Sequence, residues 1–316
     1  MHRRTFLKGT ASASAWAWFS SGPAVLASTA APARFKLGAI SDGFSQNLDE
    51  ALTIMKSYGL SWVEIRNVDG VYNTEATPAQ VRRMKQMIDQ HGFRVSVIDS
   101  AFYKCELPGT TPVKAEKDMY PYSRQMDLLK RASERAHILG AQKIRGFTFW
   151  RVADPAPISK RIAAELEKAA EVARQEGMRL VIENEESCNA ATGHELSKIF
   201  SLAPAANLGV NWDVGNGYAQ GEISYPDGYD ALDHKRVWHL HLKGMKCDVG
   251  VKNCEETFAG EGQIDLSGQL KRLLQDGYEG TMSLECEFKG SGLTHLETTK
   301  RSLEGLLRAV SAATGK

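Results

Sequence analysis

Four stretches of the sequence end in side chains that bind metal ions, and each side chain lies at the end of a short apolar run. These side chains are Glu183, Asp213, His241 and Glu285. Taken singly, an acid at a strand end commonly caps the next helix, and a strand histidine is commonly packed in the core. The same kind of ligand at four successive strand ends instead predicts one metal site.

The run from 237 to 243 contains one of these four side chains together with a second histidine and a lysine. His239, His241 and Lys243 occupy alternate positions, and in a strand that spacing turns all three side chains to one face. Spacing alone does not rank the two histidines. Three carboxylates with one imidazole suit Mn²⁺, Mg²⁺ or Co²⁺ better than a structural zinc, which favours thiolate and imidazole, and Zn²⁺ remains an alternative.

Alternating strand and helix patterns predict the fold that positions these groups. Strand-like runs occur at 35–41, 62–66, 94–98, 143–149, 179–183, 208–213, 237–243 and 281–285. Helical patterns follow them at 48–58, 78–91, about 122–139, 158–173, 193–202, near Tyr229, 266–276 and about 294–310. This series predicts one domain, residues 28–316, folded as a closed (β/α)₈ TIM barrel, whose usual size is about 250 residues.

An open, doubly wound sheet is the main alternative fold. It is disfavoured because no strand is followed by a Gly-x-Gly-x-x-Gly turn. In a barrel the active site lies at the carboxyl ends of the strands, where the four ligand candidates are expected. The longest predicted loops, about 100–120 and 244–264, would lie above the barrel mouth and could act as lids.

Four motifs carry a family resemblance: LVIEN at 180–184, VNWDVGN at 210–216, HLHLK at 239–243 and GYEGTMSLE at 277–285. Together they resemble the xylose isomerase-like barrel family of sugar phosphate isomerases and epimerases. Relatives in that family include ketose 3-epimerases, hydroxypyruvate isomerases and inosose dehydratases. The resemblance extends to segments 38–43 and 260–265 and covers essentially the whole chain after its first residues.

The resemblance implies that Glu183, Asp213, His241 and Glu285 hold one divalent metal ion. It also implies that Glu183 and Glu285 serve as the acid and base pair. The implied activity is that of a metal-dependent isomerase or epimerase, which acts on a ketose or oxidised sugar through a metal-bound enediolate. Two carboxylates on opposite faces of such a substrate can remove and return a proton.

Further side chains are candidates for substrate contact: Lys243, Asn216, Arg66, His239 and Trp150. Lys243 could neutralise an enediolate or take part in an ion pair, and His239 could instead support the ligand histidine from below. The ketose 3-epimerases carry a histidine where this chain has Asn216. Because an amide cannot transfer protons at neutral pH, this difference weakens the 3-epimerase assignment but leaves the metal site intact.

Three other functions remain open from the sequence. A lyase or dehydratase acting on a keto-sugar, keto-glycoside or inosose needs the same removal of a C–H proton, followed by loss of an oxygen substituent. An endonuclease IV-like nuclease is disfavoured because strands three, four and six offer no histidine at their ends. A sugar-binding protein without activity is disfavoured because all four ligand positions hold competent residues.

The first residues predict export. Arg3 and Arg4 precede an Ala- and Ser-rich run and a small-residue cleavage site near Ala27, a pattern typical of a twin-arginine (Tat) signal peptide over residues 1–27. We therefore expect a periplasmic protein, with no later segment apolar enough to span a membrane. Export favours the lyase alternative slightly, because free sugar phosphates are largely cytoplasmic.

Net charge argues against nucleic acid as a partner. Without residues 1–27 the chain loses three basic residues and no acid, so 39 basic and 38 acidic residues become 36 and 38. Phosphate backbones require clustered basic charge, so a small carbohydrate is the expected partner. The oligomeric state stays open, a homo-oligomer included.

The 5 cysteines have no Cys-x-x-Cys pair, so no zinc knuckle is indicated. Export would permit Cys247 and Cys254 to form a disulfide, and free thiols are the alternative.

Overall fold

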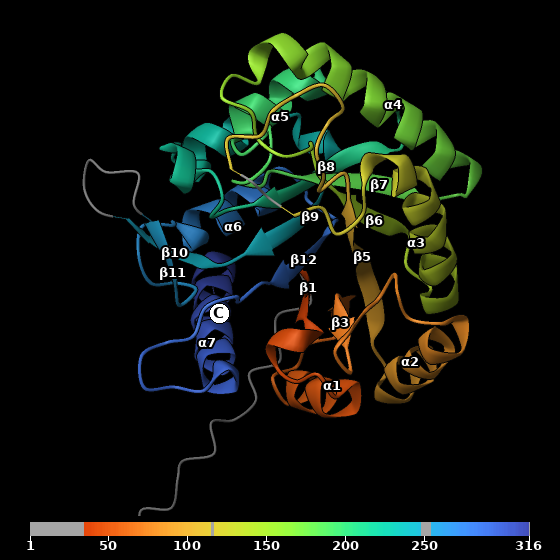
Figure 1. Cartoon of the computed structure of the whole chain (residues 1–316). Helices are drawn as coiled ribbons and strands as arrows, with labels where there is room; N and C mark the ends of the chain where they lie inside the picture. The colour runs from red at the N-terminus through yellow and green to blue at the C-terminus, as the bar shows by residue number, and fades with distance from the viewer. Residues whose placement is uncertain (1–34, 115–116, 248–253, 316) are drawn as a thin grey trace, which may run out of the picture.

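The computed structural model describes residues 35–114, 117–247 and 254–315, and its centre is a closed barrel of parallel strands (Figure 1). The barrel strands are β1 (Lys36–Ile40), β2 (Trp62–Ile65), β5 (Arg94–Phe102), β6 (Lys143–Gly146), β7 (Arg179–Glu183), β8 (Leu208–Asp213), β9 (Val237–Leu242) and β12 (Thr281–Leu284). They pair in the order β1-β12-β9-β8-β7-β6-β5-β2, and β1 also pairs with β2 to close the ring. The predicted TIM barrel is confirmed.

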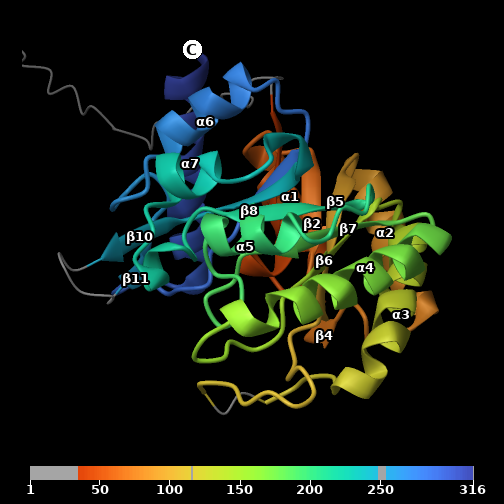
Figure 2. The same ribbon diagram turned by 90° about the horizontal axis from the view of Figure 1, so that it is seen from above.

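Helices surround the barrel in both views (Figures 1 and 2). They are α1 (Leu48–Ser57), α2 (Pro78–His91), α3 (Gln125–Leu139), α4 (Ser159–Gln175), α5 (Gly193–Phe200), α6 (Leu266–Gln275) and α7 (His295–Thr314). The helix expected near Tyr229 is a short helical segment, Ser224–Gly228. Single helical turns occur at Ser41–Gly43, Tyr122–Arg124, Ala156–Ile158, Tyr218–Gln220 and His234–Arg236.

Local sequence explains where these elements begin and end. Helix α2 starts with a capping box, in which the Thr77 hydroxyl accepts from the Gln80 N–H, and Pro78 fits the first helical position. It ends at Gly92, whose φ of 77° favours glycine. Along each helix one apolar face packs on the barrel, so Leu52 and Met55 of α1 are fully buried.

The structure differs from the sequence prediction mainly around the loops. β5 continues to Phe102 instead of ending at 98, and β6 ends at Gly146, short of the predicted 149. The region 244–264, predicted as a loop, contains the hairpin of β10 (Gly244–Cys247) and β11 (Cys254–Thr257). A second small hairpin, β3 (Asn67–Val68) with β4 (Val71–Tyr72), follows β2. Local sequence patterns do not determine where a strand ends, because the end depends on the neighbouring strand with which it pairs.

A disulfide joins Cys247 and Cys254 across the β10–β11 hairpin, which projects from the barrel in both views (Figures 1 and 2). The pairing that the sequence left open is therefore present. The other cysteines, Cys105, Cys188 and Cys286, are buried free thiols.

Strand register brings the predicted ligands to one end of the barrel. Asp213 of β8 is paired with His241 of β9, and His241 is paired in turn with Ser283 of β12, two positions before Glu285. No helix of the described residues is long and apolar enough to cross a membrane. The signal peptide expected over residues 1–27 lies outside the described residues.

Candidate metal centre and active site

His241 is the centre of a cluster formed by all four predicted ligands. Its Nδ1 lies 3.2 Å from Glu183 Oε1, 3.3 Å from Glu285 Oε2 and 4.0 Å from Asp213 Oδ2. One ligand atom of each residue lies within 4.8 Å of the others, and all four residues are buried. The barrel thus brings together residues from three strands and from the position directly after β12.

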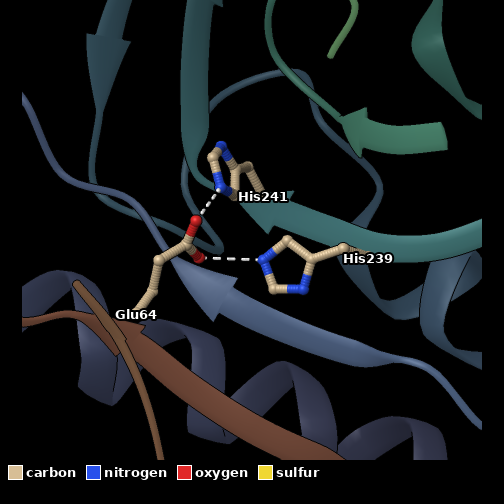
Figure 3. Close-up of side chains that lie close together, drawn as sticks. All are labelled: Glu64, His239 and His241. Carbon is tan, nitrogen blue, oxygen red and sulfur yellow. Dashed lines mark hydrogen bonds and ion pairs between the residues drawn. The ribbon is translucent and has the colours of Figure 1, made fainter. Parts of the chain in front are cut away.

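The opposite ring nitrogen of His241 is held by Glu64 of β2 (Figure 3). Glu64 Oε1 lies 3.2 Å from His241 Nε2, and Glu64 Oε2 lies 2.8 Å from His239 Nε2. Burial opposes ionisation of Glu64, but His241 and His239 outweigh it and hold the Glu64 pKa well below its usual value. Donation from His241 Nε2 to this carboxylate leaves Nδ1 directed at the cluster.

His239 lies beneath the cluster and connects it to the floor of the barrel. Its Nδ1 is 2.7 Å from Thr281 Oγ1, which also accepts a 2.9 Å hydrogen bond from Lys143 Nζ. Burial lowers the His239 pKa to about 4, so the ring is neutral and can donate to Glu64 while it accepts from Thr281. His239 lies two positions before His241 on β9, in register with the first residue of β12, so it supports the ligand histidine from deeper in the barrel.

Lys243 joins two of the clustered carboxylates. Its Nζ lies 2.8 Å from Glu285 Oε2 and 2.9 Å from Asp213 Oδ2. Burial opposes its charge, yet Asp213 and Glu285 raise the Lys243 pKa well above its usual value. Lys243 is therefore a permanent cation at the edge of the cluster.

Each of the two candidate acid–base glutamates contacts an arginine; Arg145 is buried and Arg66 is partly buried. Arg145 of β6 places Nη1 3.0 Å from Glu183 Oε2 and also pairs with Asp99 of β5. Arg66 places Nη1 3.4 Å from Glu285 Oε1, while Asp42 holds its Nε and Nη2 at 3.0 Å each. The forked contact with Asp42 fixes the Arg66 guanidinium, and each arginine places one nitrogen against one oxygen of its glutamate.

Asn216 is turned back towards the protein. Its N–H donates to Asp213 Oδ1 at 2.8 Å, and its side-chain amide donates to the Asn184 carbonyl at 2.8 Å. Asn184 in turn binds both the N–H and the carbonyl of Asp213. These contacts orient the Asp213 carboxylate, so Asn216 acts on the site through Asp213.

Trp150 is placed apart from the cluster. Its indole N–H donates to Asp118 Oδ1 at 2.6 Å, and the ring packs against Phe147 and Cys188. It lines a separate cavity of about 230 Å³ near the barrel rim, together with Glu186. Within the described ranges no hydrogen bond or ion pair joins Trp150 to the four clustered residues.

The chemistry of this network fits a divalent cation. Through its ion pairs it joins seven carboxylates to only three permanent cations: Asp42, Glu64, Asp99, Glu183, Asp213, Glu285 and Glu287, with Arg66, Arg145 and Lys243. Burial raises the Asp213 pKa to about 7 although Lys243 opposes the shift. Glu183, Glu285 and Glu64 overcome burial to raise the pKa of His241 well above normal. Positive charge is therefore favoured where His241 Nδ1 meets the carboxylates.

Two functional acids were missed by sequence reasoning, Asp42 and Asp99. Asp42 lies in the turn after β1, and Asp99 follows a run of Val, Ser, Val and Ile, so each obeys the rule that selected the other strand-end acids. Burial raises the Asp99 pKa to about 8 even though Arg145 opposes it. The signal was present for both: Asp42 lies in segment 38–43, to which the resemblance extends, whereas Asp99 lies outside the segments that carried it.

Comparison with known proteins identifies the family. The sequence pattern described as "Xylose isomerase-like TIM barrel" matches residues 52–309. The chain belongs to this family. The xylose isomerase-like assignment agrees with the closed barrel and with the placement of the acidic and histidine side chains at its strand ends.

Named relatives within and around this xylose isomerase-like family are distant. The inosose dehydratase of Clostridium beijerinckii is 27% identical over 143 residues, covering 40% of this chain and 47% of that protein, so the match spans about half of the relative. The IolI protein, crystallised with a zinc atom, superposes with a TM-score of 0.69 at 18% identity, covering 88% of this chain and 98% of that one. An L-ribulose 3-epimerase gives a TM-score of 0.65 at 17% identity, covering 88% and 95%. The two structural likenesses establish the fold.

Proposed function

We propose that this protein is a metal-dependent sugar isomerase or epimerase. Its substrate would be a ketose or oxidised sugar, and the reaction would pass through an enediolate. The observation that carries the proposal is the pair of glutamates, Glu183 and Glu285, on either side of His241 at 3.2 and 3.3 Å, each held by its own arginine. Moving a proton between two faces of a carbon takes an acid–base group on each face, and a pair of carboxylates can fill both roles.

The residues of this chain fit distinct steps of that reaction. Glu183, Asp213, His241 and Glu285 would hold one divalent ion, which when bound would polarise the substrate carbonyl. Glu183 and Glu285 would remove and return the proton. Lys243, a buried cation 2.8 Å from Glu285 Oε2, would offset negative charge that develops on the substrate. Arg145 and Arg66 keep the two glutamates ionised and oriented.

Mn²⁺, Mg²⁺ and Co²⁺ are the proposed metal ions, because three oxygen ligands and one imidazole suit hard and borderline cations. Zn²⁺ is a further candidate, and a zinc atom is what the IolI structure contains.

Elimination is the second candidate reaction. It is favoured by the sequence relatives, since the matched curated relatives given above include an inosose dehydratase. The first step, removal of a C–H proton beside a carbonyl, is the same. The outcomes diverge when the substrate loses a hydroxyl or glycosidic oxygen instead of regaining a proton.

Product analysis in D₂O separates the two candidates. The protein, loaded with Mn²⁺, is incubated with a panel of ketoses, inososes and 3-keto glycosides, and the products are followed by NMR. Deuterium at a carbon that keeps all its substituents supports isomerisation, whereas an unsaturated product rejects it in favour of a lyase. Glu285→Gln is the inactive control, and an absence of turnover with the whole panel would argue for a binding protein.

We also propose that the chain is exported by the twin-arginine pathway and acts in the periplasm. The support is the Arg3-Arg4 pair followed by an Ala-rich run. Changing both to lysine should retain the precursor in the cytoplasm, and fractionation of cells expressing each form measures this. Periplasmic recovery of the double variant would contradict the proposal.

A further inference from the structure

A large cavity lies at the end of the barrel opposite the proposed metal centre. It measures about 1000 Å³ and is lined by the first residues of several strands, among them Lys36 of β1, Trp62 of β2, Lys143 of β6 and Thr281 of β12. The clustered ligands, by contrast, lie at the strands' carboxyl ends. The cavity is therefore a separate feature from the site described above.

Basic side chains dominate the wall of this cavity. Six of them line it, compared with three acids: Lys36, Lys85, Arg94, Lys143, Arg179 and Lys235, with Asp89, Asp276 and Glu279. Two of the acids are already paired, Asp89 with Lys85 and Asp276 with Arg272. Apart from Lys85, the basic residues have no carboxylate within 4.0 Å in the part of the chain that the structure describes. The cavity thus has an excess of uncompensated positive charge.

Among these cations, Lys143 gives the strongest indication of an anionic ligand, because it lies on the cavity floor. Its ammonium donates to a single neutral partner, Thr281 Oγ1, at 2.9 Å. Burial lowers the Lys143 pKa to about 8; the Glu64 carboxylate in the barrel core opposes this shift, whereas Lys36 and Arg179 add to it. An ammonium that is largely withdrawn from water beside other cations, with no carboxylate in ion-pair contact among the described residues, is costly, and an anionic ligand would reduce that cost.

Aromatic rings hold two of the other cations in place. The Arg179 guanidinium lies 5.2 Å from the ring centre of Trp238, and that of Arg94 lies 5.8 Å from the ring centre of Trp62. Stacking restricts these arginines while it leaves their N–H groups free to donate. Lys143 and Arg179 are paired in register on neighbouring strands, whereas Lys36 approaches from β1. Basic side chains from several strands of the barrel therefore line the cavity.

We propose that this cavity binds a small molecule with more than one phosphate group. The floor cation Lys143 and the stacked Arg179 and Arg94 would contact phosphate oxygens. Arginine and lysine side chains commonly bind phosphate in proteins, and several cations around one cavity suit an anion with more than one phosphate group better than a single phosphate. This site is independent of the carbohydrate chemistry proposed for the other end.

Calorimetric titration with inorganic diphosphate and inorganic monophosphate tests the proposal. The variants are Lys143→Met/Arg179→Met and, as a milder pair on the exposed wall, Arg94→Gln/Arg179→Gln. The matched control is Lys160→Met/Lys271→Met, which removes two exposed lysines outside the cavity. Any diphosphate that binds a metal ion at the other end contributes equally to every protein and cancels in the comparison.

The unchanged protein and the control should bind diphosphate equally, at least tenfold more tightly than monophosphate, and more weakly as salt rises. Both cavity variants should lose at least tenfold in affinity for diphosphate. Three results would overturn the proposal: no binding of diphosphate, equal affinity in control and cavity variants, or equal affinity for the two anions. Circular dichroism of each variant establishes that it is folded before titration.

Discussion

Arg145 Nη1 lies 3.0 Å from Glu183 Oε2, and both side chains are almost fully buried. The same guanidinium pairs with Asp99, so one arginine of β6 contacts acids on both flanking strands, β5 and β7. On the other side of His241, Arg66 contacts Glu285 in a similar way. The orientation of each proposed acid–base glutamate therefore depends on an arginine that never needs to touch substrate.

Replacing Arg145 should therefore lower the stability of the folded protein. Arg145→Met would leave Asp99 and Glu183 buried without their partner, and the free energy of unfolding should fall by about 3–5 kcal/mol in urea titration. Arg174→Met, which removes an exposed arginine of α4, should leave stability unchanged. Partial recovery is expected in Arg145→Met/Glu183→Gln, because the Glu183 pKa is held below its usual value and the double variant removes that stranded charge. Equal stability of the single variant and the unchanged protein would show that the network is not needed.

Metal content checks the four ligands directly. Glu285→Gln and Asp213→Asn should each lower bound Mn²⁺ measured by mass spectrometry after dialysis, because each removes an anionic oxygen from the cluster. The matched control is Glu287→Gln, which lies two positions away and also contacts Arg66 but contributes no atom to the cluster. If both ligand variants retain the full metal content, the assignment of this cluster is wrong.

Glu64 should tune the affinity of the metal without supplying a ligand. Glu64→Gln weakens the contact that fixes the His241 ring, so metal affinity should fall by about 10–100-fold while one ion still binds at saturation. Thr281→Val, which removes the more distant contact to His239, should have a smaller effect. Competition with a fluorescent chelator measures both. An unchanged affinity in Glu64→Gln would mean that packing alone orients His241.

Lys143 should make stability depend on pH. Its folded-state pKa of about 8 is lower than the unfolded value near 10.5, so the folded protein releases this proton first. The cost to folding of burying the charged Lys143 ammonium is fully present below pH 8 and decreases as pH rises towards 10.5. Lys143→Met should therefore be more stable than the unchanged protein at pH 7, by up to about 3 kcal/mol, with the gap closing at higher pH. Urea titrations of both proteins across pH 7–10 test this, and a gap that does not narrow would contradict it.

Thiol counting checks the hairpin disulfide. With Cys247 joined to Cys254, unfolded protein under non-reducing conditions should react with three equivalents of Ellman's reagent, from Cys105, Cys188 and Cys286. After reduction the count should rise to 5. Reaction of all five thiols before reduction would show that the bond does not form.

Much of the fold could be read from local pattern. Apolar runs of strand length alternate with helical stripes, so the number of βα units follows from the sequence. Several of these runs end in an acid, so the end of the barrel that carries Glu183 and Asp213 follows as well. The predicted ends of strands were less accurate where they depend on pairing with another strand. β5 reaches Phe102 because it continues alongside β6, and the β10–β11 hairpin forms because its two segments pair with each other.

The sequence by itself determined the ligand types, their strand-end positions and the family resemblance, because each of these is encoded in a few consecutive residues. Only the tertiary structure decided which atoms meet. Glu64 and His239 are 175 positions apart in the chain, yet they share a hydrogen bond of 2.8 Å in the barrel core. Closure of the barrel creates such contacts by bringing distant strands around one axis, and no local pattern contains that information.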